Sequence, residues 1–306
     1  MKKILVYRNC SLGDFLVSLS AIKILKAKYP ESNIYFSTVK SKVDGIISPD
    51  NIKIEKGLIH KFIFFSYNIF SLINFYFKLR AEKFESIYYL NEINSYLKLK
   101  RDYVFFRLIG TKLFGFNIEN YNYEKFNEEY YLCKRVDKNV SKEIILKLFK
   151  SNKKIKKSKI ITISLGGRNK KKKWQKQKWK CLIKQIISQF PNLKIIIVGS
   201  KKEKKISDEI SLLDKKRIFN LSGKTSIDKL FEIIKISSYH ISHDDGTMHI
   251  ASIFQKKGVA MFGITSEKGR WFPSNRNFTI FYPNTDINQI NPFRVFNLIK
   301  YDLKKI

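Results

Sequence analysis

Apolar runs in the first half of the chain alternate between strand-like and helix-like spacing. Residues 3–8 (KILVYR) and 33–38 (NIYFST) are short and almost continuously apolar, as buried strands are. Between them, residues 14–29 carry apolar side chains at the three- and four-residue spacing of a helix. The same alternation continues with an expected strand at 62–65, a helix at 69–82 and a strand at 86–91.

The alternation restarts after a basic, weakly apolar segment, NKKIKKSK (152–159). Expected strands lie at 160–165, 194–200, 239–243 and 257–263, with a short one around FNLSG. Expected helices lie at 176–190, 201–213, 226–236 and 246–254. Because helices of this length connect parallel strands, the pattern predicts an α/β protein with two doubly wound parallel sheets.

This pattern divides the chain into domains. We expect an N-terminal domain over residues 1–152 and a C-terminal domain over residues 160–287. Residues 153–159 form the expected linker, because like charges repel and extend a chain. Residues 288–306 are helical in pattern and are available to pack back on the N-terminal domain.

The charge balance is extreme but does not name a partner. The 306 residues hold 60 lysines and arginines against 26 acidic residues, a net charge of +34. Such a charge favours polyanions such as nucleic acid, anionic lipid or phosphorylated saccharide, and a solvated basic surface accounts for it equally well. A basic protein that binds nucleic acid or anionic lipid therefore stays an alternative, although no known nucleic-acid-binding motif is present.

Cysteine content and hydropathy favour a reduced, cytoplasmic location. Cys10, Cys133 and Cys181 are far apart and follow no metal-ligand spacing. The longest uncharged stretch, residues 62–77, is too short to span a membrane, and the N-terminal apolar run is too short for a secretory signal. A strand followed by a helix is one interpretation of 62–77, and an aromatic face that enters a membrane interface is the other. The sequence thus predicts a soluble or peripheral protein.

The first strand-to-helix turn, RNCSLGDF (8–15), has features of a catalytic turn. Gly13 permits a tight turn and a close approach by a ligand. Asp14 lies at the expected helix N-terminus, where the helix dipole stabilises an ionised carboxylate that can act as a general base. The alternative is that Asp14 or Ser11 merely caps the helix.

The turn SHDDGTMHIA (242–251) carries the strongest local signal. Asp244, Gly246 and Thr247 occupy the turn and the first helical positions, where free backbone amides bind phosphate. His249 lies one turn into the helix, on the side that faces the strand ends, and a buried, hydrogen-bonded histidine is the stronger alternative interpretation for it. A metal site built from His243, Asp244 and His249 is the weaker interpretation, because no further ligands accompany them.

Other phosphate-binding motifs are missing or incomplete. No dinucleotide-binding glycine motif follows any expected strand. The segment LSGKTS (221–226) has Ile218 where a P-loop requires glycine, so it predicts only a helix N-cap.

The order of the motifs resembles glycosyltransferase family 9, the ADP-heptose:lipopolysaccharide heptosyltransferase family. The matching pieces are RNCSLGD, SLGG…KW, VGSKKE, LSGKTS, SHDDGTMHIA and MFGIT…WFP, in that order. The resemblance covers residues 1–38 and about 160–273, and residues 40–150 carry almost none of it.

The resemblance implies a GT-B architecture, in which two Rossmann-like domains face each other across a cleft. It implies an inverting, metal-independent glycosyltransferase without a cofactor, which transfers heptose from ADP-heptose to a lipopolysaccharide core or a related envelope saccharide. The donor would bind the C-terminal domain, and the N-terminal domain, including residues 40–150, would bind a phosphorylated, lipid-linked acceptor. Such an enzyme would work as a peripheral protein on the anionic inner face of the inner membrane, with no nucleic-acid partner.

The resemblance also assigns residues. Asp14 matches the catalytic base, and Ser11 and Gly13 match the turn around it. Donor-binding roles fall on Lys173 (pyrophosphate), Glu203 (nucleoside), and Asp244, Gly246, Thr247 and His249 (pyrophosphate and sugar). The lysines at 170–172 are expected to be solvated or available to lipid phosphates.

Asp245 departs from the family pattern, which carries Ser or Thr there. A second carboxylate beside a pyrophosphate repels it unless it is turned away or paired with a lysine. An inactive relative that binds sugar nucleotides therefore remains an alternative, as does a nucleotide-sugar epimerase of the same architecture.

Overall fold

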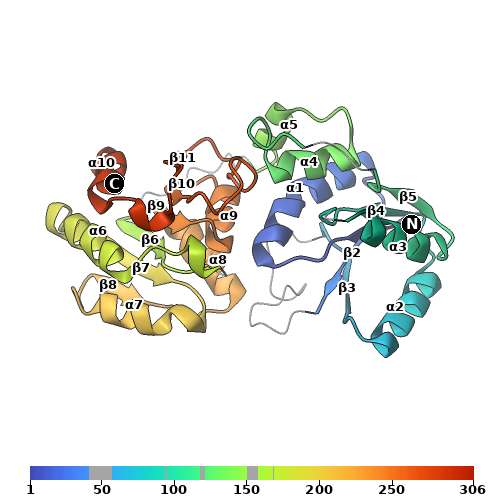
Figure 1. The fold of residues 1–306 in the computed structure, drawn as a ribbon, viewed down its shortest axis with the longest axis horizontal. Coiled ribbons are helices and arrows are strands. Elements are labelled where there is room, and N and C mark those ends of the chain that lie inside the picture. Colours follow the sequence, from blue (N-terminus) through green and yellow to red (C-terminus); the bar gives the residue numbers. More distant parts are fainter. Residues whose placement is uncertain (41–56, 94, 118–120, 150–157, 168) are drawn as a thin grey trace. The chain divides into compact units, whose positions relative to one another are not determined.

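The computed structural model describes residues 1–40, 57–93, 95–117, 121–149, 158–167 and 169–306 (Figure 1). The chain forms two compact units. Unit 1 consists of Met1–Asn122 and Glu128–Leu148, and unit 2 of Tyr123–Asn127 and Phe149–Ile306. Each unit holds a parallel sheet with helices on its faces, so the expected α/β class with two doubly wound sheets is confirmed. Most of the expected linker, 153–159, lies outside the described residues.

The sheet of unit 1 has the strand order β3-β2-β1-β4-β5, and all described pairs are parallel. Its elements are β1 (Lys3–Tyr7), α1 (Leu12–Lys28), β2 (Asn33–Val39), β3 (Lys61–Phe65), α2 (Ile69–Glu82), β4 (Ser86–Tyr89), α3 (Tyr96–Arg107), β5 (Lys112–Phe114), α4 (Glu128–Val136) and α5 (Lys142–Lys147).

Alternating side chains divide the core of unit 1 between the two faces of its sheet. On one face, Tyr35 and Ile63 pack with side chains of α2 and α3. On the other face, the Phe15 ring of α1 contacts the rings of Phe36 and Phe62. Residues 15–22 of α1 are buried, because this helix lies between the sheet and α4. This explains why apolar side chains occur on all sides of α1 in this stretch.

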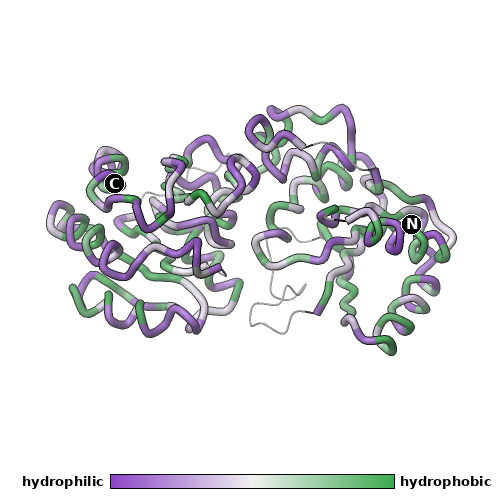
Figure 2. Tube along the Cα trace, in the orientation of Figure 1, coloured by the Kyte–Doolittle hydropathy of each residue, from purple (hydrophilic) through white to green (hydrophobic). Residues whose placement is uncertain are grey.

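The sheet of unit 2 has the order β11-β10-β9-β6-β7-β8, again parallel. The first elements are β6 (Ile160–Ser164), η1 (Lys170–Lys172), α6 (Lys176–Gln189), β7 (Lys194–Val198), η2 (Lys201–Glu203), α7 (Lys204–Ser211) and β8 (Ile218–Asn220). They are followed by α8 (Ile227–Ile236), β9 (Tyr239–His243), α9 (Gly246–Ile253), β10 (Lys257–Met261), β11 (Phe278–Phe281), η3 (Ile287–Gln289) and α10 (Pro292–Leu303). Hydrophobic and hydrophilic residues alternate along both the helices and the strands of unit 2 (Figure 2).

The C-terminal helix α10 belongs to unit 2 and lies against α6. Its apolar side chains Val295, Phe296 and Ile299 are buried in the same core as Trp179 and Leu182 of α6. Burial of this apolar face stabilises the helix where it lies.

A short segment of the N-terminal half also belongs to unit 2. Residues Tyr123–Asn127 lie beside residues 268–274: Asn127 Nδ2 donates to Phe272 O and to Ser274 Oγ, each at 2.8 Å. Gly269, with φ +84°, makes this approach possible, because a Cβ there would lie 1.8 Å from Tyr123 O. The expected boundary near residue 152 did not predict that Tyr123–Asn127 belong to unit 2.

The predicted N-cap at the start of α8 is confirmed. Ser226 Oγ accepts a hydrogen bond from Lys229 N, so the GKTS segment begins a helix. Among the described residues, none of the helices has the length and apolar content needed to cross a bilayer.

Candidate active site

The sheet of unit 2 reverses its winding between β6 and β9. From β6 the chain continues outward through β7 and β8, and it then returns to β9 and proceeds to β10 and β11 on the other side. In open parallel sheets, ligands bind outside the carboxyl ends of the strands at such a reversal. The loop after β6 and the turn after β9 carry most of the predicted donor-binding residues to this edge.

Lys173 and Glu203 form an ion pair here, with 2.8 Å between Nζ and Oε1. Glu203 ends η2, which follows β7, and its Oε2 accepts hydrogen bonds from the Ser200 amide (3.1 Å) and hydroxyl (2.5 Å). Burial alone would raise the pKa of Glu203, but the Lys173 ammonium and Ser200 outweigh it and hold the pKa below its usual value. The result is an ionised carboxylate that is 8% exposed.

Gly166 leaves the space that the Glu203 side chain occupies. A Cβ at Gly166 would lie 2.7 Å from Cγ and Cδ of Glu203. A Cβ at the neighbouring Gly167 would meet nothing within 4 Å. Gly166 thus fixes where the carboxylate can lie.

Lys172 forms a second, parallel ion pair. Its Nζ lies 2.5 Å from Oδ2 of Asp244, which also accepts a hydrogen bond from Ser266 Oγ at 2.9 Å. The expectation that Lys172 is solvated is therefore wrong, because the short helix η1 turns it toward the carboxyl end of β9. The Lys172 and Lys173 side chains remain 21% and 29% exposed, so both ammonium groups are accessible to a ligand.

Asp245 is turned into the protein as the N-cap of α9. Its Oδ1 accepts hydrogen bonds from Thr247 N (2.8 Å), Met248 N (3.0 Å) and Thr247 Oγ1 (2.6 Å). Burial raises the pKa of Asp245 to about 6, against these bonds and one from Ser164 that lower it. The Thr247 amide, which we expected to bind phosphate, is consequently occupied by this cap.

A buried polar chain supports the cap. The His240 ring lies between Thr162 Oγ1, 2.9 Å from Nδ1, and Thr247 Oγ1, 3.0 Å from Nε2. Because the Thr247 hydroxyl donates to Asp245, Nε2 donates to Thr247 and Nδ1 accepts from Thr162. Burial lowers the pKa of His240 to about 3, which keeps the ring neutral. The Thr247 side chain thus links His240 to Asp245 within the protein.

His243 anchors the lysine-bearing loop. Its Nε2 accepts the Trp174 amide at 3.2 Å, and its Nδ1 lies 3.4 Å from Gly166 O. Burial lowers the pKa of His243 to about 4. Both ring nitrogens are engaged by backbone, which argues against His243 as a metal ligand. Within the described residues, no three His, Cys, Asp or Glu side chains gather as a metal cluster.

Gly246 and His249 lie at the start of α9. Gly246 is the first residue of the helix and is partly exposed, directly after the two aspartates. His249 is one turn further and only 8% exposed, as expected of a buried histidine. Gly246 is therefore the residue of this turn best placed to approach a ligand.

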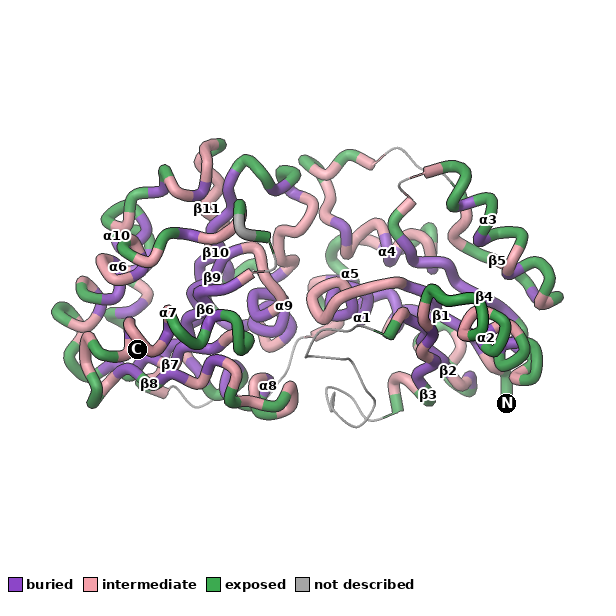
Figure 3. The backbone as a smooth tube through the Cα atoms, turned by 60° about the horizontal axis from the view of Figure 1, so that its bottom comes forward, coloured by how far each residue is buried: buried purple, intermediate pink, exposed green. Residues whose placement is uncertain are grey.

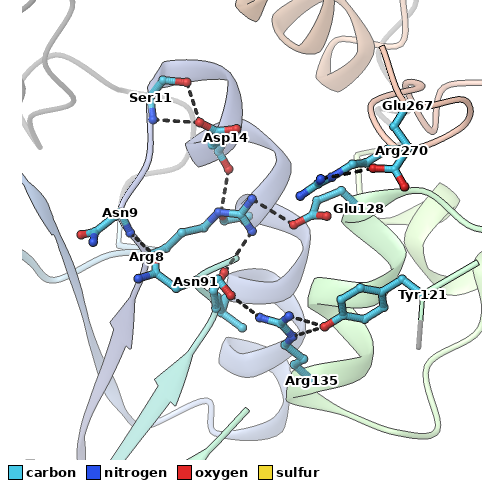
Figure 4. Close-up of polar contacts among 12 residues, drawn as sticks. Arg8, Asn9, Ser11, Asp14, Asn91, Tyr121, Glu128, Arg135, Glu267 and Arg270 are labelled. Atoms are coloured by element: carbon cyan, nitrogen blue, oxygen red, sulfur yellow. Dashed lines mark hydrogen bonds and ion pairs between the residues drawn. The ribbon is translucent and has the colours of Figure 1, made fainter. Parts of the chain in front are cut away.

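In unit 1, Asp14 lies in the first turn of α1 (Figure 4). Its Oδ2 accepts hydrogen bonds from the Ser11 amide (3.0 Å) and the Ser11 hydroxyl (2.7 Å). Gly13 is helical, in the first turn rather than before it. Asp14 and Ser11 thus form a cap at the start of α1. Among the described residues, none donates a hydrogen bond to Asp14 Oδ1, so this oxygen is available to accept a proton.

Residues that the sequence did not single out surround this turn. Arg8 is 3% exposed and donates to Leu90 O and to Glu128 Oε1, each at 3.3 Å (Figure 4). The Asn9 amide donates to Asn91 Oδ1. Arg8 and Asn91 follow the adjacent strands β1 and β4, between which the sheet of unit 1 reverses. A polar residue at the end of the expected strand 86–91 was the available signal for Asn91. Glu128 lies on α4, far away in the sequence, and no local pattern marked it.

Comparison with known proteins places this geometry in a family. The model of glycosyltransferase family 9 (heptosyltransferase) matches residues 111–291, more than half of the chain. The chain belongs to glycosyltransferase family 9. A lipopolysaccharide heptosyltransferase 1 from Campylobacter coli is 29% identical over 125 residues, which are 40% of this chain and 36% of that protein. The match thus spans only about a third of that relative's length.

Solved structures resemble this family 9 chain over nearly its whole length. The E. coli ADP-heptose lps heptosyltransferase II has a TM-score of 0.73 at 19% identity and covers 100% of this chain and 99% of its own. The E. coli heptosyltransferase WaaC with ADP-2-deoxy-2-fluoro heptose has a TM-score of 0.72 at 12% identity and covers 98% and 99%. These likenesses agree with the GT-B fold class expected from the sequence.

The family 9 chain therefore brings together part of the predicted set. Lys173, Glu203, Asp244 and Gly246 lie at the carboxyl edge of the second sheet, joined by Lys172, which the sequence did not select. Thr247 and His249 lie behind that edge, in the protein interior. Asp14, Ser11 and Gly13 form one turn of unit 1.

Proposed function

We propose that this protein is an inverting, metal-independent glycosyltransferase that transfers heptose from ADP-heptose to a lipopolysaccharide core or a related envelope saccharide. Family membership and the heptosyltransferase names of its relatives support the reaction class. One observation carries the proposal: two adjacent lysines, each paired with a carboxylate, lie where an α/β sheet binds its ligand.

On this proposal, Lys172 and Lys173 bind the donor pyrophosphate. Two ammonium groups compensate the diphosphate charge, so the donor needs no metal for binding. Glu203, held ionised by Lys173 and Ser200, accepts hydrogen bonds from ribose hydroxyls. Gly246 lets the diphosphate approach the start of α9, and Asp244 completes the pyrophosphate and sugar site, with His249 behind it in the protein interior.

Asp14 is the proposed general base. An acceptor hydroxyl oxygen attacks the anomeric carbon, a new glycosidic bond forms, and the bond from that carbon to the pyrophosphate breaks. The hydroxyl proton passes to the free Oδ1 of Asp14, and ADP leaves with the electron pair. The two lysines stabilise the charge that develops on the departing diphosphate. Attack from the face opposite the leaving group inverts the anomeric centre.

The proposed acceptor is phosphorylated, saccharide in nature and linked to lipid. Such an acceptor places the enzyme, as a peripheral protein, at the inner face of the inner membrane. Asp245 does not argue for an inactive relative, since its carboxylate is turned into the cap of α9 and away from the lysines.

Calorimetric titration with ADP-heptose, UDP-glucose and GDP-mannose tests the donor assignment. We expect binding of the ADP sugar, with weaker or no binding of the other two. No binding of any nucleotide sugar would overturn the proposed function, and preference for a UDP or GDP sugar would overturn the choice of donor.

A further inference from the structure

The outer side of α2 and α3 in unit 1 is apolar where a soluble protein is usually polar. On α2, Phe70, Ile73 and Phe77 are 82%, 48% and 63% exposed. On and just after α3, Leu97, Val104 and Leu108 are 76%, 50% and 62% exposed. Exposed positions recur along both helices between partly and fully buried ones (Figure 3). These six side chains define what we call the α2–α3 surface.

The two helices present this surface as one layer. The rings of Phe75 on α2 and Phe105 on α3 stack with 5.9 Å between centroids, and Tyr76 Oη donates to Leu108 O. The opposite sides of both helices, with Phe75 and Phe106, are buried in the core of unit 1. Phe70, Ile73 and Phe77 follow helical spacing, as do Leu97, Val104 and Leu108, so each set occupies one outer stripe.

Cations flank the α2–α3 surface, and the nearby acids are neutralised. Lys78 on α2 and Lys98 and Lys100 on α3 are exposed, and no carboxylate in the described part of the chain pairs with them. Asp102, the acid of α3, is buried and accepts hydrogen bonds from Tyr89 and Arg101. Glu82, the acid of α2, pairs with Lys3 and Lys61. The surface is therefore apolar with a net positive rim.

We propose that the α2–α3 surface docks the protein on an anionic lipid bilayer. Phe70, Ile73, Phe77 and Leu97 would enter the membrane interface. Apolar faces of interfacial helices lie about 5–10 Å deep there, at the boundary between headgroups and acyl chains. Lys78, Lys98 and Lys100 would lie among the lipid phosphates. A second copy of this chain is a poor occupant, because two basic rims repel each other.

This inference deepens the proposed function by naming the surface that meets the membrane of a lipid-linked acceptor. Docking itself requires neither donor nor acceptor. The two proposals can therefore fail separately.

Vesicle co-sedimentation of the full chain tests the docking. Phosphatidylethanolamine–phosphatidylglycerol vesicles supply the anionic surface, and phosphatidylcholine vesicles are the neutral comparison. We expect binding to the anionic vesicles, with a partition coefficient reduced about tenfold or more in Phe70→Ser/Phe77→Ser and in Lys98→Ser/Lys100→Ser.

Matched controls come from unit 2. Leu212 and Ile236 are 64% and 51% exposed, and Lys215 and Lys216 are exposed lysines. Leu212→Ser/Ile236→Ser and Lys215→Ser/Lys216→Ser should bind vesicles like the wild type. An equal loss in these controls, binding to neutral vesicles as strong as to anionic ones, or no vesicle binding would overturn the docking surface.

A second measurement does not depend on the stability of the serine variants. Tryptophan introduced at Phe70 should be quenched by vesicles of brominated lipid beyond the wild-type background, and tryptophan at Leu212 should not. Absence of that difference, or a dimer in light scattering that Phe70→Ser/Phe77→Ser abolishes, contradicts membrane docking. Transfer to a detergent-solubilised acceptor should survive in Phe70→Ser/Phe77→Ser. Failure of vesicle binding with intact nucleotide binding would leave the proposed function in place.

Discussion

Lys173 donates to Glu203 at the carboxyl edge of the second sheet, with 2.8 Å between Nζ and Oε1. The pair holds an ammonium group and an ionised carboxylate in fixed positions after β6 and β7. Lys172 and Asp244 repeat the arrangement at the end of β9. Because both lysines stay partly exposed, a diphosphate can compete with the carboxylates for their charge.

Three consecutive lysines, 171–173, allow specific binding of the donor pyrophosphate to be distinguished from a nonspecific effect of positive charge. Lys173→Ala and Lys172→Ala should each weaken ADP-heptose binding about 10- to 100-fold, because each removes a charge-assisted hydrogen bond of about 1.5–3 kcal/mol. Lys171→Ala should bind like the wild type, since the Lys171 side chain is exposed and makes no ion pair with a described residue. Calorimetric titration measures all three, and a Lys173→Ala affinity within about twofold of Lys171→Ala would contradict the assignment.

Adjacent glycines test the position of Glu203. Gly166→Ala places a methyl group 2.7 Å from Cδ of Glu203 and should displace the carboxylate, at a cost of about 1–3 kcal/mol in stability or donor binding. Gly167→Ala adds the same methyl group with nothing within 4 Å. Thermal unfolding and donor titration of the two variants should therefore differ, and equal behaviour would mean that Glu203 is not confined by the loop.

Asp245 should make stability depend on pH in an unusual direction. Its pKa of about 6 exceeds the unfolded value of about 4, so the folded protein binds this proton more tightly. The contribution of Asp245 to stability is present below about pH 4 and is lost as the pH rises through about 6. Asp245→Asn cannot ionise and can keep the cap. Its free energy of unfolding, relative to that of the wild type, should therefore increase by on the order of 2–3 kcal/mol as the pH rises from about 4 to about 6.

Urea unfolding of wild type and Asp245→Asn across about pH 4 to 8 measures this difference. His240 and His243 contribute in the opposite sense, because burial lowers their pKa values to about 3 and 4. They are common to both proteins and largely cancel. Asp214→Asn is the control: the Arg217 side chain holds the pKa of Asp214 below its usual value, so this variant should lose stability above about pH 4. A flat difference curve for Asp245→Asn would contradict the buried ionisation.

Asp14→Asn should separate binding from chemistry. Asparagine can still accept both hydrogen bonds from Ser11, but it cannot take the proton of the acceptor hydroxyl. We expect kcat to fall about 10²- to 10⁴-fold with donor affinity unchanged. Ser11→Ala, which removes the hydroxyl contact with Asp14, should cost about 1 kcal/mol of stability or less and leave most of kcat. Comparable kcat in Asp14→Asn and wild type would exclude Asp14 as the base.

Most of the fold could be predicted from the periodicity of apolar residues along the chain. Strand β9 and helix α2 have the predicted bounds, and the other predicted strands and helices differ at their ends by a few residues at most. Elements with weak periodicity were not anticipated. The three residues of β5 are partly exposed at the sheet edge, and α3 mixes lysines into its outer face. The place of Tyr123–Asn127 in unit 2 depends on contacts with residues 268–274, which no local sequence pattern encodes.

The candidate site was likewise predictable only in part. Lys173, Glu203, Asp244 and Gly246 follow predicted strands, so the strand ends brought them to one edge. The direction of each side chain was not available from spacing. Asp245 turns inward to cap α9, which occupies the Thr247 amide, and η1 turns Lys172 toward Asp244. These outcomes depend on backbone geometry within single turns.

The most direct test of the central claim is mass spectrometry of lipopolysaccharide that lacks its heptose residues, after incubation with this protein and ADP-heptose. The proposed function predicts an acceptor whose mass increases by one heptose residue, with release of ADP and with loss of the product in Lys173→Ala and Asp14→Asn. An acceptor of unchanged mass, from protein that binds ADP-heptose in the calorimeter, would contradict it.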